Sequence, residues 1–176
     1  MWKTKQTSVL LLFFLLSLSG WLWEVLFVAL TTGSFVNRGF LHGPWLPIYG
    51  FGGLAILALL RRSRGLPLFL LSALLGGSLE YLTSLLLEVL FRTRWWDYAS
   101  WPCNLDGRIC LGSLLAFGLA GWLLVTLLAP ALTRLLARLP RHFQKRLGQA
   151  LTLLFAADAA FSLMAPNTGA GISFRL

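Results

Sequence analysis

One apolar run limits the folds open to this chain more than any other feature. Residues 66–91 form 26 consecutive positions without lysine, arginine or aspartate, and Glu80 stands at their middle. A helix of roughly 20 apolar residues crosses a hydrocarbon core about 30 Å thick. A carboxylate at that depth is costly unless it faces protein, a water-filled cavity or a counter-charge. The run therefore predicts a membrane-spanning helix whose acidic group faces a polar interior.

The same pattern recurs along the chain, because Glu24 and Asp158 also lie in membrane-length apolar runs. This predicts an all-α polytopic membrane helix bundle with about five transmembrane helices and long irregular extracytoplasmic loops. We expect a single transmembrane domain over residues 1–176, with spans at about 8–31, 45–60, 66–91, 109–129 and 147–165. Segment 131–146 is expected to be a cytoplasmic extension or an interfacial amphipathic helix. The glycine-rich tail from Asn167 is expected to be mobile.

The first apolar run has two interpretations, because it follows Lys3 and Lys5 as a signal peptide would. Ser17-Leu18-Ser19 has the small-x-small pattern of a cleavage site. Hydrophobicity continues beyond that site, from Trp21 to Ala29, and this favours an uncleaved first helix.

Composition and charge agree with a membrane protein. The chain is 57% hydrophobic and 12% charged, whereas a soluble domain carries roughly twice that charged fraction. The formal net charge of +9 would suit nucleic acid, but the basic residues form short clusters between apolar runs, as topology signals do. No nucleic-acid partner is expected. The sequence contains no G-x-x-x-x-G-K-[ST] loop, so we do not expect this chain to hydrolyse ATP by that mechanism.

Basic residues divide unequally between alternate loops of a five-span chain. One side holds ten of them: Lys3, Lys5, Arg61, Arg62, Arg64, Arg134, Arg138, Arg141, Lys145 and Arg146. The other side holds five: Arg38, Arg92, Arg94, Arg108 and Arg175. The positive-inside rule then places the N-terminus in the cytoplasm and the C-terminus on the extracytoplasmic side.

Two polar loops, residues 33–52 and 94–108, are then expected on the extracytoplasmic side. Their glycines and prolines interrupt regular helix and let backbone approach a ligand closely. Such backbone is stable at membrane depth only where it is buried in protein or lines a cavity. Pro47 and Gly50 fall inside the second apolar run, so its outer end is expected to be partly unwound. The tryptophans of the second loop fit an interfacial aromatic belt equally well.

The third expected helix carries two carboxylates on one side. Glu80 and Glu88 are eight residues apart and therefore lie within an arc of about 80°. With Arg38 and Arg108 in the two loops, this arrangement favours a polar cavity over a purely structural network. We expect both arginines to converge with these carboxylates or with Asp97 into one extracytoplasmic polar cluster. Glu24 joins this cluster if the first helix turns that side inward. The alternative is that each arginine extends to headgroup phosphate.

Other reactive residues give weaker signals. Asp158 stands among alanines and is interpreted as a packing residue at a small-residue interface. His42 and His142 have no second ligand at metal spacing, so neither a metal nor a cofactor is expected. Cys103 and Cys110 permit a disulfide on the outer side, and free thiols are an equal alternative. No serine stands in a nucleophile elbow, so no catalytic residue is assigned.

A set of motifs also resembles a known family. They are Trp23-Glu24, Asn37-Arg38-Gly39-Phe40-Leu41, Gly43-Pro44, Pro47-Ile48-Tyr49-Gly50-Phe51-Gly52, Glu80-Tyr81, Thr83-Ser84, Glu88, Trp95-Trp96-Asp97-Tyr98, Pro102, Asn104 and Gly107-Arg108. Over roughly residues 8–165 the chain resembles the bacterial integral membrane family named putative ABC-transporter type IV, or ABC-transporter permease-like. The resemblance implies a permease subunit in the bacterial cytoplasmic (inner) membrane whose ATPase is a separate protein.

The positions that match the family pattern are the candidate residues of a substrate cavity. They are Glu24, Asn37, Arg38, Pro47, Tyr49, Glu80, Ser84, Glu88, Asp97, Asn104 and Arg108. Five helices would form a complete path only as a homo-oligomer or with partners. Membrane lipids are the remaining expected partners.

Three functions are compatible with these features. A transporter subunit would use a polar cavity open to the extracytoplasmic side, and segment 131–146 as a surface for a motor protein or for anionic lipid. An intramembrane enzyme would use a carboxylate as general base, with Arg38 and Arg108 holding a lipid-linked phosphate. A non-catalytic lipid-binding or assembly protein is the third.

Overall fold

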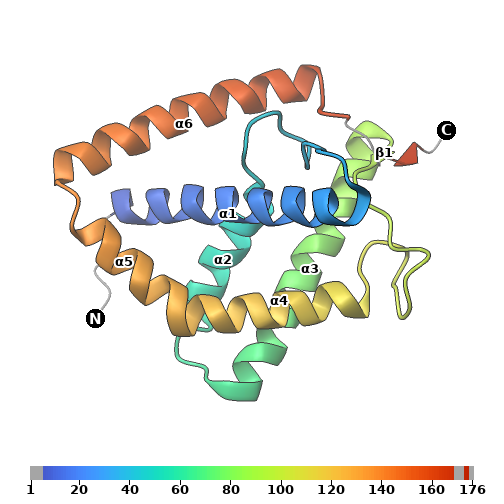
Figure 1. Cartoon of the computed structure of the whole chain (residues 1–176), viewed down its shortest axis with the longest axis horizontal. Coiled ribbons are helices and arrows are strands. Elements are labelled where there is room, and N and C mark those ends of the chain that lie inside the picture. Colours follow the sequence, from blue (N-terminus) through green and yellow to red (C-terminus); the bar gives the residue numbers. More distant parts are fainter. Residues whose placement is uncertain (1–5, 169–172, 175–176) are drawn as a thin grey trace. The chain divides into compact units, whose positions relative to one another are not determined.

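The computed structural model describes residues 6–168 and 173–174, and nearly all of their regular structure is helix (Figure 1). The helices are α1 (Gln6–Thr32), α2 (Pro47–Leu59), α3 (Gly65–Phe91), α4 (Leu111–Leu123), α5 (Ala129–Ala137) and α6 (Arg141–Met164), with a π-helical turn η1 (Leu124–Leu128) between α4 and α5. Two short strands, β1 (Thr93–Arg94) and β2 (Ser173–Phe174), pair antiparallel. The predicted all-α class is confirmed.

Membrane-length helices account for most of the chain. Four helical stretches are long and apolar enough to cross a membrane: Ser8–Thr32, Gly65–Phe91, Leu111–Ala137 and Arg141–Met164. The polytopic membrane character is therefore confirmed. The expected second span is helical only over the 13 residues of α2. At 1.5 Å per residue it is about 20 Å long, which is shorter than a hydrocarbon core of about 30 Å.

The expected helix boundaries are wrong in the last third of the chain. Segment 131–146 is not one element, because α5 ends at Ala137 and α6 begins at Arg141. Pro140 lies between them, and proline disfavours helix at the preceding residue. Pro130, by contrast, does not end the helix. Proline lacks the N–H that would continue the hydrogen bonds of the helix. The π-helical turn η1, just before Pro130, is a local adjustment that often accompanies such a break. The last apolar helix begins at Arg141 and not at residue 147.

The chain divides into two compact units. The first unit comprises residues 1–54 and 129–169, and the second comprises residues 55–128 and 170–176. In the first unit α1 lies against α6, as Figure 1 shows. Phe13 of α1 meets Phe155 of α6 edge to face, with ring centroids 5.8 Å apart. Trp45 completes this aromatic core from the chain before α2.

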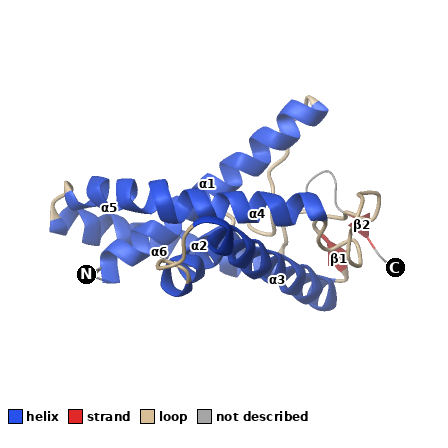
Figure 2. Cartoon of the chain, turned by 90° about the horizontal axis from the view of Figure 1, so that it is seen from below, coloured by secondary structure: helices blue, strands red, loops and turns tan. Residues whose placement is uncertain are grey.

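The second unit is built on close contact between α3 and α4. A Cβ on Gly76 would lie 2.6 Å from Phe117, and one on Gly118 would lie 2.8 Å from Phe69. The missing side chains thus make room for a phenylalanine from the facing helix, as is common where membrane helices pack. Figure 2 shows β1 and β2 beside the loop that joins α3 to α4.

Candidate functional site

The chain between α1 and α2 is irregular, yet it is held by hydrogen bonds. Leu46 donates its backbone N–H to the carbonyl oxygen of Ser17 at 3.0 Å. Ser17 is fully buried and lies near the middle of α1. Segment 33–46 therefore extends to about the middle of α1. Pro47 and Gly50 both lie within α2, so the predicted unwinding at these residues is wrong. Proline suits the first helical position because its N–H is not needed there.

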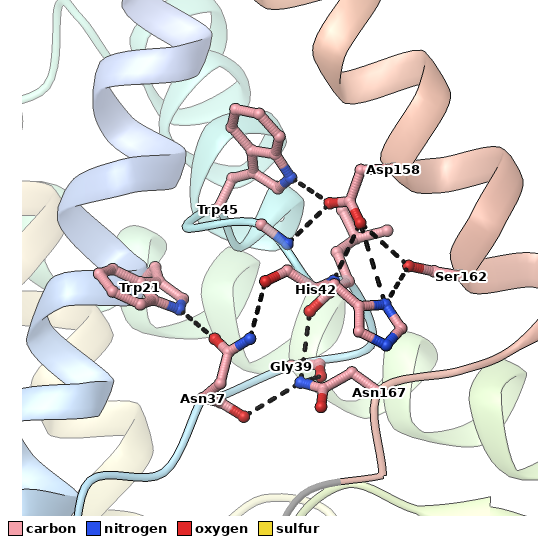
Figure 3. A network of polar contacts seen from close by, with 10 residues as sticks. Trp21, Asn37, Gly39, His42, Trp45, Asp158, Ser162 and Asn167 are labelled. Carbon is pink, nitrogen blue, oxygen red and sulfur yellow. Dashed lines mark hydrogen bonds and ion pairs between the residues drawn. The ribbon is translucent and has the colours of Figure 1, made fainter.

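Asp158 holds this segment to α6 (Figure 3). Its carboxylate accepts the backbone N–H groups of His42 at 3.1 Å and Gly43 at 2.9 Å. It also accepts the indole N–H of Trp45 at 2.6 Å and the hydroxyl of Ser162 at 3.2 Å. The interpretation of Asp158 as a packing residue is therefore wrong, because four donors converge on it.

The ring of His42 joins the same network. Its Nδ1 lies 3.0 Å from the hydroxyl oxygen of Ser162 and 4.0 Å from a carboxylate oxygen of Asp158. Figure 3 shows the imidazole beside both side chains of α6. The backbone of His42 thus binds Asp158 while its ring contacts Ser162 and Asp158, and these contacts fix the segment at His42.

Two asparagines fix the rest of the segment. The side-chain oxygen of Asn37 accepts the indole N–H of Trp21 at 2.7 Å, and its amide donates to the carbonyl of His42 at 2.8 Å. The amide of Asn167 donates to three carbonyl oxygens of the segment, those of Asn37, Gly39 and Leu41. The tail that was expected to be mobile therefore begins with an anchored residue. Residues 169–172 and 175–176 of that tail lie outside the described residues.

Glu24 is the second carboxylate of the first unit. Its carboxylate lies 3.3 Å from Nε of Arg38 and accepts the hydroxyl of Tyr49 at 2.9 Å. The Tyr49 ring covers Gly20, where a Cβ would collide with it. The predicted partners of Arg38 were Glu80, Glu88 or Asp97, and this prediction is wrong. The loop folds back onto α1 and brings Arg38 to the nearest carboxylate in sequence.

A second network gathers at the end of α3, in the second unit. Oε2 of Glu88 lies 2.6 Å from Nε of Arg94 and 2.9 Å from a terminal nitrogen of Arg108. Arg108 also donates to the hydroxyl of Ser84 at 3.1 Å. Both guanidinium groups are buried. The expected pairing of Arg108 with Glu88 is present, and Arg94 is a second cation that the sequence reasoning did not select.

Glu80 lies on the same face of α3, closer to its middle. It is buried, and the hydroxyl of Tyr98 donates to it at 3.0 Å. The expectation that Glu80 faces protein is confirmed. Next to it, Tyr81 donates to Asp106 at 2.7 Å. The loop after α3 is thus bound along the last three turns of the helix.

Asp97 and Asn104 shape that loop. Asp97 accepts the backbone N–H of Ala99 at 2.9 Å and lies 3.8 Å from Arg94. Asn104 donates to the carbonyl oxygens of Ala99 and Trp101. Both residues act within the loop, so they hold its turn and do not reach another helix.

The cysteines and possible metal ligands add no further site. Cys103 and Cys110 are free thiols, and Cys110 caps the start of α4 by accepting the backbone N–H of Ser113. Within residues 6–168 and 173–174, no group of three or more His, Cys, Asp or Glu side chains could hold a metal ion.

The comparisons with known proteins place these networks in a family. A family model described as "Putative ABC-transporter type IV" matches residues 11–163, a range that includes every carboxylate of both networks. The chain belongs to this family. No curated protein and no solved structure matches it. The resemblance carried by the loop motifs is confirmed, and this member of the family is a transporter-like membrane protein.

All six acidic side chains of this family member accept a hydrogen bond or form an ion pair. All of them except Asp97, which acts within its loop, join irregular backbone or loop side chains to a membrane-length helix. A sequence signal for this was available. The tetrapeptide Glu-Val-Leu-Phe occurs at residues 24–27 and again at 88–91. In both copies the glutamate pairs with Nε of an arginine from the following loop, Arg38 or Arg94.

Proposed function

We propose that this chain is the membrane permease subunit of an ABC transporter and that a separate protein supplies the ATPase. The observation that carries the proposal is segment 33–46, which reaches the middle of α1 beside Asp158. In transporters, irregular backbone at the midplane, next to a helix of half length, commonly forms the substrate site. Family membership and four membrane-length helices support the same function.

The short helix α2 fits this proposal. A helix that begins at the membrane midplane has only about 15 Å of hydrocarbon left to cross. The 13 residues of α2 are about 20 Å long, which is enough. Segment 33–46 and α2 together then make one discontinuous crossing, half extended and half helical. Its backbone groups would be costly in lipid, and Asp158, Asn37 and Asn167 satisfy them.

The substrate path is proposed to run along the network of Glu24 and not along that of Glu88. The side chains of Glu24 and Arg38 are 30% and 18% exposed. Those of Glu88, Arg94 and Arg108 are 17%, 7% and 9% exposed, so the second network is the less accessible one. A ligand can therefore reach the first pair without breaking the structure. Tyr49 and Asn37 stand beside this pair and would contact the same ligand. The buried network of Glu88 instead fixes the loop after α3.

Arg38→Lys is expected to reduce coupling between the path and the ATPase. The tagged full chain would be purified from native membranes, reconstituted in nanodiscs and assayed for ATP hydrolysis by a co-purified nucleotide-binding protein. Coupling energies of 1–3 kcal/mol correspond to changes of about 5- to 150-fold. We therefore expect the rate of ATP hydrolysis to fall at least about fivefold. Lysine keeps the charge but loses the fork of donors.

Arg62→Lys is the matched control, because Arg62 is an exposed arginine of the turn between α2 and α3. It should leave hydrolysis unchanged. The proposal is contradicted if no nucleotide-binding protein is retained by the wild-type chain, or if both variants have the same effect.

Topology provides an independent test of the discontinuous crossing. Reporter fusions after Ser63 and after Leu139 are expected to report the cytoplasm, and a fusion after Ser100 the extracytoplasmic side, because five crossings put ten of fifteen basic residues inside. Leu139 is the suitable position because α6 begins at Arg141. If α2 does not complete a crossing, all three reporters change sides, and that outcome would refute the discontinuous span.

A further inference from the structure

The turn between α5 and α6 exposes a dense group of cations, which we call the basic corner. Its members are Arg134, Arg138, Arg141, Lys145 and Arg146, and all five are exposed. None of them forms an ion pair within the part of the chain that the structure describes. The only acidic residue after Asp106 is Asp158, whose carboxylate is already bound by four donors. No acidic side chain of the described residues therefore neutralises the charge of the basic corner.

Gln144 fixes the conformation of the turn that carries the basic corner. Its side chain is buried and donates to the carbonyl oxygens of Leu136 at 2.8 Å and Leu139 at 2.9 Å. These carbonyls belong to the end of α5 and the turn that follows it. The backbone N–H of Gln144 donates to Pro140 at 3.0 Å, which closes the turn from the side of α6. The cations are thus presented on a fixed support, which lowers the entropy cost of binding a ligand.

The arrangement of charges is unfavourable for the chain alone. Arg141 and Lys145 are four residues apart on α6. Like charges at this spacing repel each other on a helix. Arg141 also stands in the first turn of α6, where the helix dipole disfavours positive charge. A bound anion would reverse each of these effects.

The apolar residues of the corner indicate which anion. Leu135 and Phe143 are 54% and 47% exposed and lie among the cations. The corner also joins the ends of two membrane-length stretches, Leu111–Ala137 and Arg141–Met164. We propose that the basic corner binds the phosphate headgroups of anionic phospholipids. Leu135 and Phe143 enter the acyl boundary while the guanidinium groups meet the phosphates. An acidic soluble partner would account for the cations but not for this apolar pair.

The test compares lipid binding by two charge-matched variants of the full chain. Delipidated protein would be equilibrated with mixed micelles of phosphatidylglycerol and phosphatidylcholine, and the retained lipids counted by native mass spectrometry. A cation near an anionic surface contributes about fivefold in affinity. The triple change Arg134→Gln, Arg138→Gln and Arg141→Gln is therefore expected to weaken phosphatidylglycerol binding by about tenfold or more. Phosphatidylcholine binding should not change.

The control is the triple change Arg61→Gln, Arg62→Gln and Arg64→Gln, which removes the same charge from the exposed turn between α2 and α3. It should cost clearly less affinity. Equal losses, or no loss in either variant, would overturn the proposal. Full competition by soluble glycerol phosphate would overturn it in favour of a free-phosphate site. Tighter binding of an acidic peptide than of phosphatidylglycerol would overturn it in favour of a protein partner.

A second variant keeps the test decisive if the triple variant does not fold. Lys145→Gln with Arg146→Gln changes two exposed residues of α6 that make no described side-chain hydrogen bond. This double variant is expected to lose about fivefold or more in phosphatidylglycerol binding while its thermal unfolding in phosphatidylcholine stays unchanged. Unchanged binding in the folded double variant would count against the basic corner.

Discussion

Glu88→Leu is expected to lower the free energy of unfolding by about 3–5 kcal/mol, which is a large share of the total free energy of unfolding of a typical domain. Oε2 of Glu88 is shared by Arg94 at 2.6 Å and Arg108 at 2.9 Å, and both guanidinium groups are buried. Leucine would leave the two buried cations with Asp97, 3.8 Å from Arg94, as their remaining carboxylate. Unfolding in nanodiscs, followed by circular dichroism, measures the loss.

Arg108→Leu provides the comparison, because it leaves Glu88 paired with Arg94. It should therefore destabilise the protein less than Glu88→Leu does. The double variant Glu88→Leu with Arg108→Leu should recover part of the loss, since only one buried cation then remains. Equal single effects that simply add in the double variant would show that the two side chains do not interact.

These variants also separate structure from transport. The proposed path runs along Glu24 and Arg38, whereas the arginines that bind Glu88 are buried. Each folded molecule of Glu88→Gln should therefore retain the ATPase coupling that Arg38→Lys loses. Loss of coupling in folded Glu88→Gln at full stability would move the path to α3.

The sequence predicts the membrane-length helices well because lipid leaves few alternatives. Each spanning segment must satisfy its own backbone, so long apolar runs such as 66–91 become helices almost regardless of context. Local residues also mark some boundaries. Pro47 begins α2, and Pro140 separates α5 from α6. The chain before α2 is irregular, as its glycines predicted. The irregular part ends directly before Pro47 and does not extend into α2.

Partners of the polar residues were harder to predict, because they depend on how loops fold back. Arg38 is compatible with any carboxylate near one membrane face, and sequence spacing does not reveal that its loop returns to Glu24. Arg94 was missed because it lies three residues after the end of α3, near a helix end where arginines commonly extend to headgroups. The recurrence of Glu-Val-Leu-Phe before both loops was the available signal.

Asp158 was misinterpreted for a related reason. Alanines surround it on α6, and this pattern suits both helix packing and a buried acceptor. Two of its four donors are the backbone N–H groups of His42 and Gly43, which are 116 and 115 positions away in the chain. Every residue except proline has a backbone N–H, so the residue type does not predict these two donors.

Asp158→Ala is expected to release segment 33–46 from α6 and to cost at least about 1–3 kcal/mol of stability. The change leaves the N–H groups of His42 and Gly43 and the indole N–H of Trp45 without their acceptor. The indole of Trp45 is buried, and a buried donor that loses its partner costs about 1–3 kcal/mol. Asp158→Asn keeps one carbonyl oxygen and should fall between alanine and the wild type.

Hydrogen exchange gives the direct measurement, because the amides of His42 and Gly43 should lose protection in Asp158→Ala. The control is Thr152→Ala on the same helix, whose hydroxyl donates only to the carbonyl of Gly148 at 2.7 Å. That variant should leave both amides protected and the thermal stability nearly unchanged. If Asp158→Ala behaves like Thr152→Ala in both measurements, Asp158 does not hold the segment. The discontinuous crossing would then lack the contact that keeps its backbone satisfied at membrane depth.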